Sequence, residues 1–257
     1  MTALAELTTT EIESSPPTLA IVPTGSTEQH GPALPLGTDT IVASHFAALG
    51  ASHEGVVHTP PVPVGVSPHH RHFAGSLWVG EETFKDYVEE VVRSLAAHGI
   101  ERVILVNGHG GNVNALARVG RRLRGDSVAY AVNWNWWKAV EAELDARFET
   151  AGGHACHGET SMLLAIDPEL VDEDRLDAAE TGAPPGWGKQ VHGAEVGFDT
   201  IDFTPTGAVG EPTAANAAIG QELHDLAAEA LDDLIEWMLN RSTEELYRHA
   251  EPLHPSE

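Results

Sequence analysis

The sequence predicts an α/β protein with a mostly parallel central sheet and helices on both of its faces. Two observations predict this class. Short apolar runs typical of buried strands recur along the chain, and amphipathic stretches with a period of three to four residues follow them. The repeated order of strand, helix, strand and helix favours parallel strands joined by helical crossovers. A length of 257 residues fits one large α/β domain.

Each element is expected from its own local pattern. The apolar run at 18–24 is typical of a buried strand, and prolines confine the β-rich stretch at 56–66 to an edge or a broken strand. Apolar residues at 84–95 repeat every three and four positions, which predicts a helix that Gly99 ends. The other expected elements are a helix from Thr38 or Asp39 to Gly50, a strand at 102–106, a helix at 113–123, a strand at 127–134 and a helix at 159–166.

The last third of the chain combines an irregular stretch with one long helix. Residues 181–206 are rich in glycine and proline without a sustained period, so we expect a long loop at an active site or an interface. A helix is expected to begin at 211–212, with proline in its first position. Its predicted core face comprises Leu223, Leu226, Leu231, Leu234, Ile235 and Met238. With a polar lead-in at 1–17 and a peripheral tail at 240–257, we predict a single domain over residues 1–257.

The charge balance excludes several classes of partner. Fourteen Lys and Arg residues against 39 Asp and Glu residues give a formal net charge of −25. Such a surface repels phosphate, so we expect neither a nucleic-acid partner nor docking on an anionic membrane. No apolar run approaches the ~18–20 residues of a membrane span, and no signal peptide is evident. The lone cysteine, Cys156, forbids an internal disulfide and favours a cytoplasmic location.

The first cluster of chemically active side chains occupies residues 25–32 and follows the first strand, where open α/β sheets place their sites. Residues i and i+2 of an extended segment point to the same side, so Glu28 and His30 present a carboxylate and an imidazole together. Asp39, at the start of the next helix, could turn back to the same point. These ligand types suit Zn²⁺, Mn²⁺ or Fe²⁺. The alternative is a capping aspartate beside a solvated Glu/His pair.

The second cluster, Asn-Gly-His-Gly-Gly-Asn at 107–112, lies at a predicted strand-to-helix turn. Its glycines permit a sharp turn and close approach to a ligand. His109 is either a metal ligand or part of a backbone nest for an anion, and a solvated histidine in a glycine-rich turn is the third possibility. The spacing matches neither of the common phosphate-binding glycine motifs, which favours the ligand.

The third cluster, at 154–161, places His154, Cys156, His157 and Glu159 just before a helix. Two imidazoles, a thiol and a carboxylate in six residues favour a reactive site over a polar helix entry. No sequence feature makes Cys156 a thiolate, so we do not assign it as the nucleophile.

A fourth stretch adds three histidines at 69–72, of which we expect His70 to lie near the site. Trp134, Trp136 and Trp137 could wall off a small planar substrate, although tryptophans beside a strand end more often belong to a core or an interface.

Taken in order, these clusters resemble the creatininase family of metal-dependent amidohydrolases. The resemblance covers about residues 18–239. It rests on Pro-Thr-Gly-Ser-Thr-Glu-Gln-His-Gly-Pro at 23–32, Leu-Pro-Leu-Gly-Thr-Asp at 34–39, Phe-Ala-Gly-Ser at 73–76, the turn at 107–112, Glu-Thr-Ser at 159–161 and Gly-Ala-Val-Gly-Glu-Pro-Thr at 207–213. It implies a three-layer α/β/α sandwich and a ring-like homo-oligomer, often a hexamer.

The resemblance also implies a site for two divalent metal ions (Zn, Mn or Fe). Glu28, Asp39 and His109 look like the ligands of one ion. His30 and Asp39 look like ligands of the second, with Asp39 bridging. His154 falls where the family has a catalytic histidine.

One departure from the family pattern concerns the second ion. Creatinine-hydrolysing members carry a glutamate two residues after the His109 position, and this chain has Gly111 there. Glu159 is the first candidate for the replacement ligand, and His157 is the second. Glu159 and His154 are also the candidate catalytic residues.

The function we expect is hydrolysis of a non-peptide C–N bond in a small amide substrate, such as a cyclic amide. A hydroxide held between two cations ~3.5–4 Å apart would attack the carbonyl carbon, and the cations would stabilise the oxyanion. His154 would carry a proton to the leaving nitrogen. Alternatives within the family are a deformylase and a peptidase that trims a peptide C-terminus. A catalytically silent metal- or anion-binding protein is the alternative of another class.

The acidic excess, with only three lysines, predicts a protein from a salt-rich cytoplasm, where salt screens the self-repulsion of the surface. We expect it to lose secondary structure as KCl is withdrawn, which circular dichroism at falling salt concentration would measure. Full stability and oligomerisation in low salt would identify an ordinary acidic mesophile protein instead.

Overall fold

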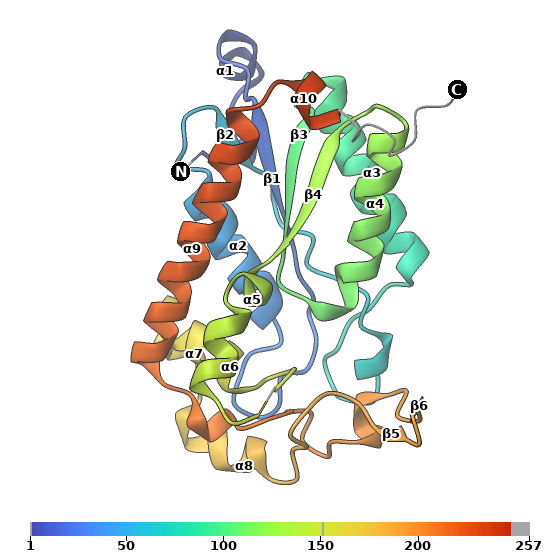
Figure 1. Cartoon of the computed structure of the whole chain (residues 1–257), viewed down its shortest axis with the longest axis vertical. Helices are drawn as coiled ribbons and strands as arrows, with labels where there is room; N and C mark the ends of the chain where they lie inside the picture. Colours follow the sequence, from blue (N-terminus) through green and yellow to red (C-terminus); the bar gives the residue numbers. More distant parts are fainter. Residues whose placement is uncertain (1, 151, 248–257) are drawn as a thin grey trace, which may run out of the picture.

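Four parallel strands form the centre of the computed structural model, which describes residues 2–150 and 152–247 (Figure 1). The strand order is β2-β1-β3-β4, so β1 and β3 are the inner strands. In register, Ile21 of β1 lies opposite Ile104 of β3, which lies opposite Val132 of β4. The strands are β1 (Leu19–Thr24), β2 (Val56–His58), β3 (Arg102–Asn107) and β4 (Tyr130–Asn135). This sheet confirms the α/β prediction.

The inner strands are apolar at successive positions because both of their faces are covered. Leu19 and Ile21 belong to the hydrophobic core on one face, whereas Ala20 and Val22 belong to the core on the other. Side chains alternate across a strand, so a strand between two helical layers needs an unbroken apolar run. That requirement explains why residues 18–24 could be recognised from sequence.

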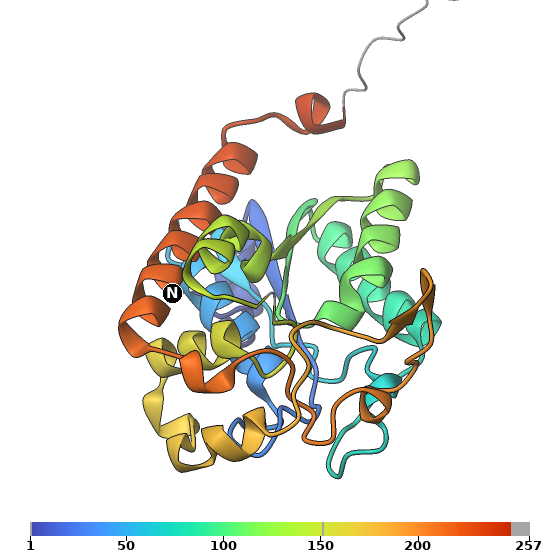
Figure 2. The same cartoon turned by 60° about the horizontal axis from the view of Figure 1, so that its bottom comes forward.

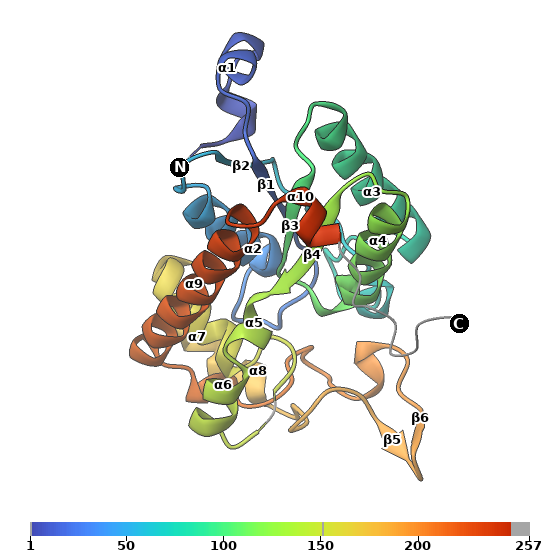
Figure 3. The same ribbon diagram turned by 45° about the horizontal axis from the view of Figure 1, so that its top comes forward.

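Helices cover both faces of the sheet and complete a three-layer sandwich (Figures 1 and 3). One layer contains α2 (Thr38–Gly50), α7 (His157–Ile166) and α9 (Ala217–Leu239). The opposite layer contains α3 (Glu81–Ala97) and α4 (Val113–Gly125). The remaining elements are α1 (Thr9–Ser14), α5 (Trp136–Ala139), α6 (Glu141–Arg147), α8 (Leu176–Glu180), α10 (Thr243–Tyr247) and a hairpin of β5 (Gln190–Val191) and β6 (Ala194–Glu195).

Two strands are shorter than the sequence predicts. The stretch at 56–66 narrows to the three-residue edge strand β2, and Val62 adds only an isolated bridge to Thr24. The prolines that remove donors from this stretch account for the loss. β4 begins at Tyr130 instead of residue 127, because Ser127 has a positive φ of 55° that breaks the extended conformation.

The prediction that the last long helix begins at 211–212 is wrong. Pro212 lies in a short 3-10 helix, η7 (Pro212–Ala214), and α9 begins at Ala217. The side chain of Asn216 accepts hydrogen bonds from two backbone amides of the first turn, so this residue caps the helix. Leu226 is 41% exposed and does not belong to the core face, whereas the other predicted residues of that face pack in the core.

The chain ends are partly ordered. Residues 1–17 include α1, whose capping box between Thr8 and Glu11 had not been predicted. At the other end, α10 buries Leu246, so the first part of the predicted peripheral tail packs on the protein. Residues 248–257 of that tail lie outside the described residues, and the single domain over 1–257 stays a prediction. Within the described chain, no helix is long and apolar enough to cross a membrane.

The carboxyl ends of the parallel strands meet at one edge of the sheet, and the connecting loops gather below it (Figure 2). Helix α2 begins directly under β1 and β3, and the hairpin of β5 and β6 lies at the same end of the molecule (Figure 1). This edge is where open α/β sheets bind ligands.

A glycine permits the close packing of α7 on α9, and its substitution should be destabilising. A Cβ on Gly220 would lie 1.9 Å from the carbonyl oxygen of Ser161. We expect Gly220→Ala to lower the free energy of unfolding in urea by about 1–3 kcal/mol, because the helices must separate. Gly125→Ala is the control, since a Cβ there meets nothing within 4 Å, and it should be neutral or slightly stabilising. Equal stability of Gly220→Ala and the parent protein would contradict the close helix contact.

Candidate metal centre

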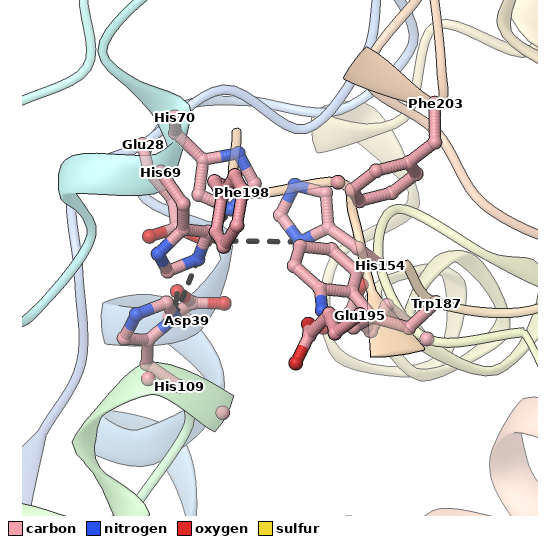
Figure 4. Close-up of a pocket in the computed structure, with 15 residues that line it drawn as sticks. Glu28, Asp39, His69, His70, His109, His154, Trp187, Glu195, Phe198 and Phe203 are labelled. Atoms are coloured by element: carbon pink, nitrogen blue, oxygen red, sulfur yellow. Dashed lines mark ion pairs between the residues drawn. The ribbon is translucent and has the colours of Figure 1, made fainter. Parts of the chain in front are cut away.

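All six residues predicted for the site converge at the carboxyl edge of the sheet, five of them around a cavity of about 450 Å³ (Figure 4). Two come from the loop after β1, one from the first turn of α2, one from the turn after β3, and two from the entry to α7 and its first turn. They are Glu28, His30, Asp39, His109, His154 and Glu159. His30 is fully buried behind the cavity.

Glu28, Asp39 and His109 form the first potential ligand group. His109 Nδ1 lies 3.2 Å from Glu28 Oε1 and 3.1 Å from Asp39 Oδ2. This is the set that the family resemblance implied for one ion.

Asp39 also belongs to the other side of the site. Its Oδ1 lies 3.0 Å from His30 Nε2, so the two oxygens of one carboxylate face two different imidazoles. This geometry fits the bridging role expected of Asp39. His30, His154 and Glu159 form a further potential ligand group, and Glu28, His70 and His154 form another.

Three of these histidines are oriented by backbone carbonyls. His30 Nδ1 donates to the carbonyl of Glu28 at 3.1 Å, and His109 Nε2 donates to the carbonyl of Val66 at 3.1 Å. His154 Nε2 donates to the carbonyl of Gln29 at 2.6 Å. When the outer nitrogen carries the proton, the inner nitrogen of a neutral ring has its lone pair directed into the site, as metal-ligating histidines require.

His70 has the opposite orientation. The amide nitrogen of Gln29 donates to His70 Nδ1 at 2.8 Å, and the amide oxygen of Gln29 accepts from the backbone of Gly31 at 2.9 Å. A ring that accepts at Nδ1 carries its proton on Nε2, which lies 3.2 Å from Glu28 Oε1. His70 therefore lies at the site, as expected, but its inner nitrogen is a donor toward Glu28.

The buried carboxylates face imidazoles alone, without a full positive counter-charge. Neither oxygen of Glu28, nor Oδ2 of Asp39, accepts a well-aligned hydrogen bond, and their nearest cationic neighbours are the rings of His70 and His109 at 3.1–3.2 Å. Of the described residues that line the cavity, none is Lys or Arg. Burying an unpaired carboxylate costs several kcal/mol, and oxygen plus imidazole donors suit Zn²⁺, Mn²⁺ or Fe²⁺. The residues present fit divalent metal ions.

The ionisation of the site reflects the same shortage of cations. Burial by itself raises the pKa of Glu28, but the neighbouring His109 and His70 hold it well below its usual value. Burial by itself lowers the pKa of His30, but Asp39 raises it to about 9. The pKa of Glu159 is raised to about 7, chiefly by burial. Protonated imidazoles thus supply the positive charge in the metal-free protein.

The space at Gly111 explains the departure from the creatinine-hydrolysing pattern. A Cβ there would lie 2.2 Å from the carbonyl of Val66 and 2.5 Å from His109 Nε2, so a glutamate does not fit. Glu159 lies among the potential ligands, with Oε2 accepting from the backbone of Ala155 at 2.5 Å. His157 instead stacks on Phe148, with ring centroids 4.0 Å apart, and belongs to none of the ligand groups.

The other residues of the 107–112 turn hold it against the loop after β1. A Cβ on Gly108 would lie 2.1 Å from the carbonyl oxygen of Asp39. Asn112 donates to the carbonyl of Gly25 at 3.0 Å and accepts from the backbone of Val66 at 2.9 Å. Gly108 and Asn112 therefore position His109 and Asp39 without touching the cavity themselves.

Sequence reasoning missed the aromatic side of the cavity. Its lining includes His69, Trp187, Glu195, Phe198 and Phe203 (Figure 4). All but His69 come from the stretch at 181–206, which was expected at an active site or an interface. Its glycine and proline content was the only available signal, because these side chains follow no periodic spacing.

Two other sequence hypotheses concern Trp134 and Cys156. Trp134 packs against Phe46 in the core, with ring centroids 5.4 Å apart, and does not line this cavity. Burial raises the pKa of the Cys156 thiol, and the charge of Glu159 raises it further. A thiol held in its neutral form is a poor nucleophile.

Metal binding should release protons, because His30, with its pKa of about 9, and Glu159, with its pKa of about 7, are protonated in the metal-free protein below those values. We expect Zn²⁺ affinity to fall as pH falls, by up to about tenfold per unit for each proton displaced. Calorimetry at pH 6, 7 and 8 in buffers of different ionisation enthalpy measures this release. Glu159→Gln should reduce the number of protons released, and Glu236→Gln, at an exposed position, should not. A Zn²⁺ affinity that does not change with pH would contradict the assignment of His30 and Glu159 as ligands.

Comparison with known proteins identifies the family. The family model described as creatinine amidohydrolase (creatininase) matches residues 5–235. The mycofactocin precursor peptide peptidase of Mycobacterium ulcerans is 35% identical over 241 residues, which cover 90% of this chain and 88% of that protein. The creatinine amidohydrolase of Pseudomonas putida is 29% identical over 174 residues, which cover 61% of this chain and 67% of that protein.

Solved structures share the fold. A protein from Bacteroides fragilis superposes with a TM-score of 0.79 at 27% identity, covering 94% of this chain and 98% of that one. A crystal structure of creatininase superposes with a TM-score of 0.76 at 23% identity, covering 93% and 98%. The match of the family model over nearly the whole chain, together with these relatives, shows that this chain belongs to the creatininase family of amidohydrolases.

Proposed function

We propose that this chain is a metal-dependent hydrolase that cleaves the C–N bond of an amide in a short peptide. The observation that carries the proposal is the pair of buried carboxylates, Glu28 and Asp39, which have only imidazoles and no Lys or Arg around them, at the edge of one cavity. Such a donor set binds divalent ions. Divalent ions beside a cavity that admits substrate are suited to amide hydrolysis, because they activate water and polarise a carbonyl.

Three observations favour a peptide over a small cyclic amide. The peptide peptidase of M. ulcerans matches 90% of this chain, whereas the creatinine amidohydrolase of P. putida matches 61%. The position of Gly111 has no room for the glutamate of creatinine-hydrolysing members. The cavity of about 450 Å³ also exceeds the need of a single small ring, and Phe198 at its mouth is 79% exposed.

The candidate ligands would hold two ions, with Asp39 common to both sets. Glu28, Asp39 and His109 would hold one ion, and Asp39, His30 and Glu159 the other. When bound, such ions supply Lewis acidity, which makes water a better nucleophile and polarises the substrate carbonyl. Solved creatininases of the same fold include a Zn–Zn form and a manganese form, which supports Zn²⁺ or Mn²⁺ as the first ions to test.

His154 is placed to move the proton. Burial lowers its pKa well below the usual value, and the charges of His30 and His70 lower it further, so the ring is neutral. Its Nε2 proton is held by the carbonyl of Gln29, and its Nδ1 lone pair faces the cavity. His154 Nδ1 accepts a proton from the attacking water and delivers it to the amide nitrogen as the C–N bond breaks. The products are a carboxylate and a protonated amine, which together account for both protons of the water.

His70 and the aromatic residues support this chemistry. The Nε2 proton of His70 points at Glu28 Oε1, which fixes the orientation of that carboxylate. Trp187 and Phe203 pack edge to face, with ring centroids 5.1 Å apart, and line the cavity on the side opposite His109 (Figure 4). Their apolar surface limits the access of bulk water.

The wider setting of the reaction remains as the sequence predicts it. We retain a cytoplasmic location, a ring-like homo-oligomer and adaptation to high salt as predictions.

The test combines metal analysis with a substrate panel. We expect protein purified without chelator to contain about two transition-metal ions per chain, measured by plasma mass spectrometry. Chromatography with mass spectrometry should detect hydrolysis of short peptides in preference to formamides, lactams and creatinine. Glu28→Gln should lower both metal content and kcat/KM, the latter by about 100-fold or more. The exposed control Glu236→Gln should retain both.

Other outcomes identify the alternatives. Turnover confined to formamides or cyclic amides would assign a small-amide hydrolase. Bound metal without turnover of any amide would favour the silent metal-binding protein. Full activity of Glu28→Gln, or of protein stripped of metal, would overturn the mechanism.

A further inference from the structure

A second cavity of about 280 Å³ adjoins the catalytic one. Gly110, Gly153 and Glu159 line both cavities, so the two meet beside the candidate ligand Glu159. The second cavity is lined by residues of α5 and α6, whereas His69 and His70 line only the catalytic cavity. The other residues that line the second cavity are neither candidate metal ligands nor proton carriers in the proposed mechanism.

Two tryptophans form its apolar wall. Trp136 is buried and Trp137 half-buried, and their rings meet edge to face at 87° with centroids 6.1 Å apart. Both line the second cavity, with Leu144 of α6 beside them. The sequence suggests Trp134, Trp136 and Trp137 as a wall beside a substrate. Of these three, Trp136 and Trp137 line a cavity next to the catalytic one. We call this space the indole cavity.

The charge of the indole cavity is negative. Its lining includes the carboxylates of Glu141, Asp145 and Glu159, and none of its described lining residues is Lys or Arg. Glu141 is already paired with Lys138, which lies outside the lining. Asp145 is exposed and has no ion-pair partner among the residues that the structure describes. Indole faces and an unpaired carboxylate attract cations and repel anions.

Two of the three residues shared with the catalytic cavity are glycines. A Cβ on Gly110 would meet nothing within 4 Å, so this position borders free space. Gly153 is more enclosed, since a Cβ there would lie 3.2 Å from the Cβ of Trp187. The free space beside Gly110 is therefore where an extended substrate could reach both cavities.

We propose that the indole cavity is a specificity subsite that binds a positively charged side chain, Arg or Lys, of the substrate peptide next to the scissile bond. The aliphatic stem lies along Trp136 and Trp137, and the cation lies near Asp145. The proposal rests on the proposed function, because it places the scissile amide in the catalytic cavity.

The kinetic test uses matched peptides that differ only in the residue next to the scissile bond, which is Arg, norleucine or Glu. We expect the metal-loaded enzyme to favour Arg over Glu about tenfold in kcat/KM, mainly through KM. Asp145→Lys should reverse the order, and Trp137→Ala should remove the preference for Arg over norleucine. Asp233→Lys on the exposed face of α9 is the charge-matched control and should keep the parent preference. An unchanged Arg/Glu ratio in Asp145→Lys would overturn the proposal.

A binding test separates this inference from the proposed function. Protein labelled with 5-fluorotryptophan carries six reporters, which single Trp→Phe variants assign. Benzylammonium should shift the ¹⁹F signals of Trp136 and Trp137, and phenylacetate, its anionic counterpart, should not. Equal shifts with both probes, or a shift confined to Trp187, would overturn the subsite. Selective shifts without hydrolysis of any amide would refute the proposed function alone, whereas hydrolysis without selective shifts would refute the subsite alone.

Discussion

The carboxylate of Asp39, shared between two imidazoles, is the interaction on which the rest of the site depends. Its oxygens lie 3.0 Å from His30 and 3.1 Å from His109, which come from loops 79 residues apart in the chain. The sharing is possible because β1 and β3 are adjacent and parallel, so both strands end beside the first turn of α2. Gly108 permits the final approach, since any Cβ there would overlap the backbone of Asp39.

Burial makes this arrangement electrostatically demanding. Glu28 and Asp39 are almost completely enclosed without Lys or Arg in the described lining, so their charge is balanced by histidines or by metal ions. The raised pKa of His30 and the lowered pKa of Glu28 have the same cause, which is the attraction between buried imidazoles and buried carboxylates. A bound cation would replace the protons, which links metal affinity to pH. The acidic exterior of the protein, at −25 overall, does not change this local requirement.

The walls of the two cavities and the candidate ligands come from different parts of the structure. The candidate ligands come from the ends of strands and the starts of helices, whereas the cavity walls come largely from the short helices α5 and α6 and from the irregular stretch at 181–206. Substitutions in these walls can therefore reshape the cavities without changing the candidate ligands. Glu159 lines both cavities, so the proposed second ion and the proposed subsite would share this residue.

The sequence alone predicted the parallel sheet and its helices, and, with the family resemblance, it named six candidate site residues that the structure brings together. Strands buried on both faces must be apolar throughout, and residues that follow such strands gather at one edge, so local patterns carried this information. Only the tertiary structure decided the proton position on His70, which depends on Gln29 and thereby on Gly207, 178 residues away. It also decided the aromatic walls and the start of α9 at Ala217. These features arise from contacts between distant segments, which leave no period or spacing in the sequence.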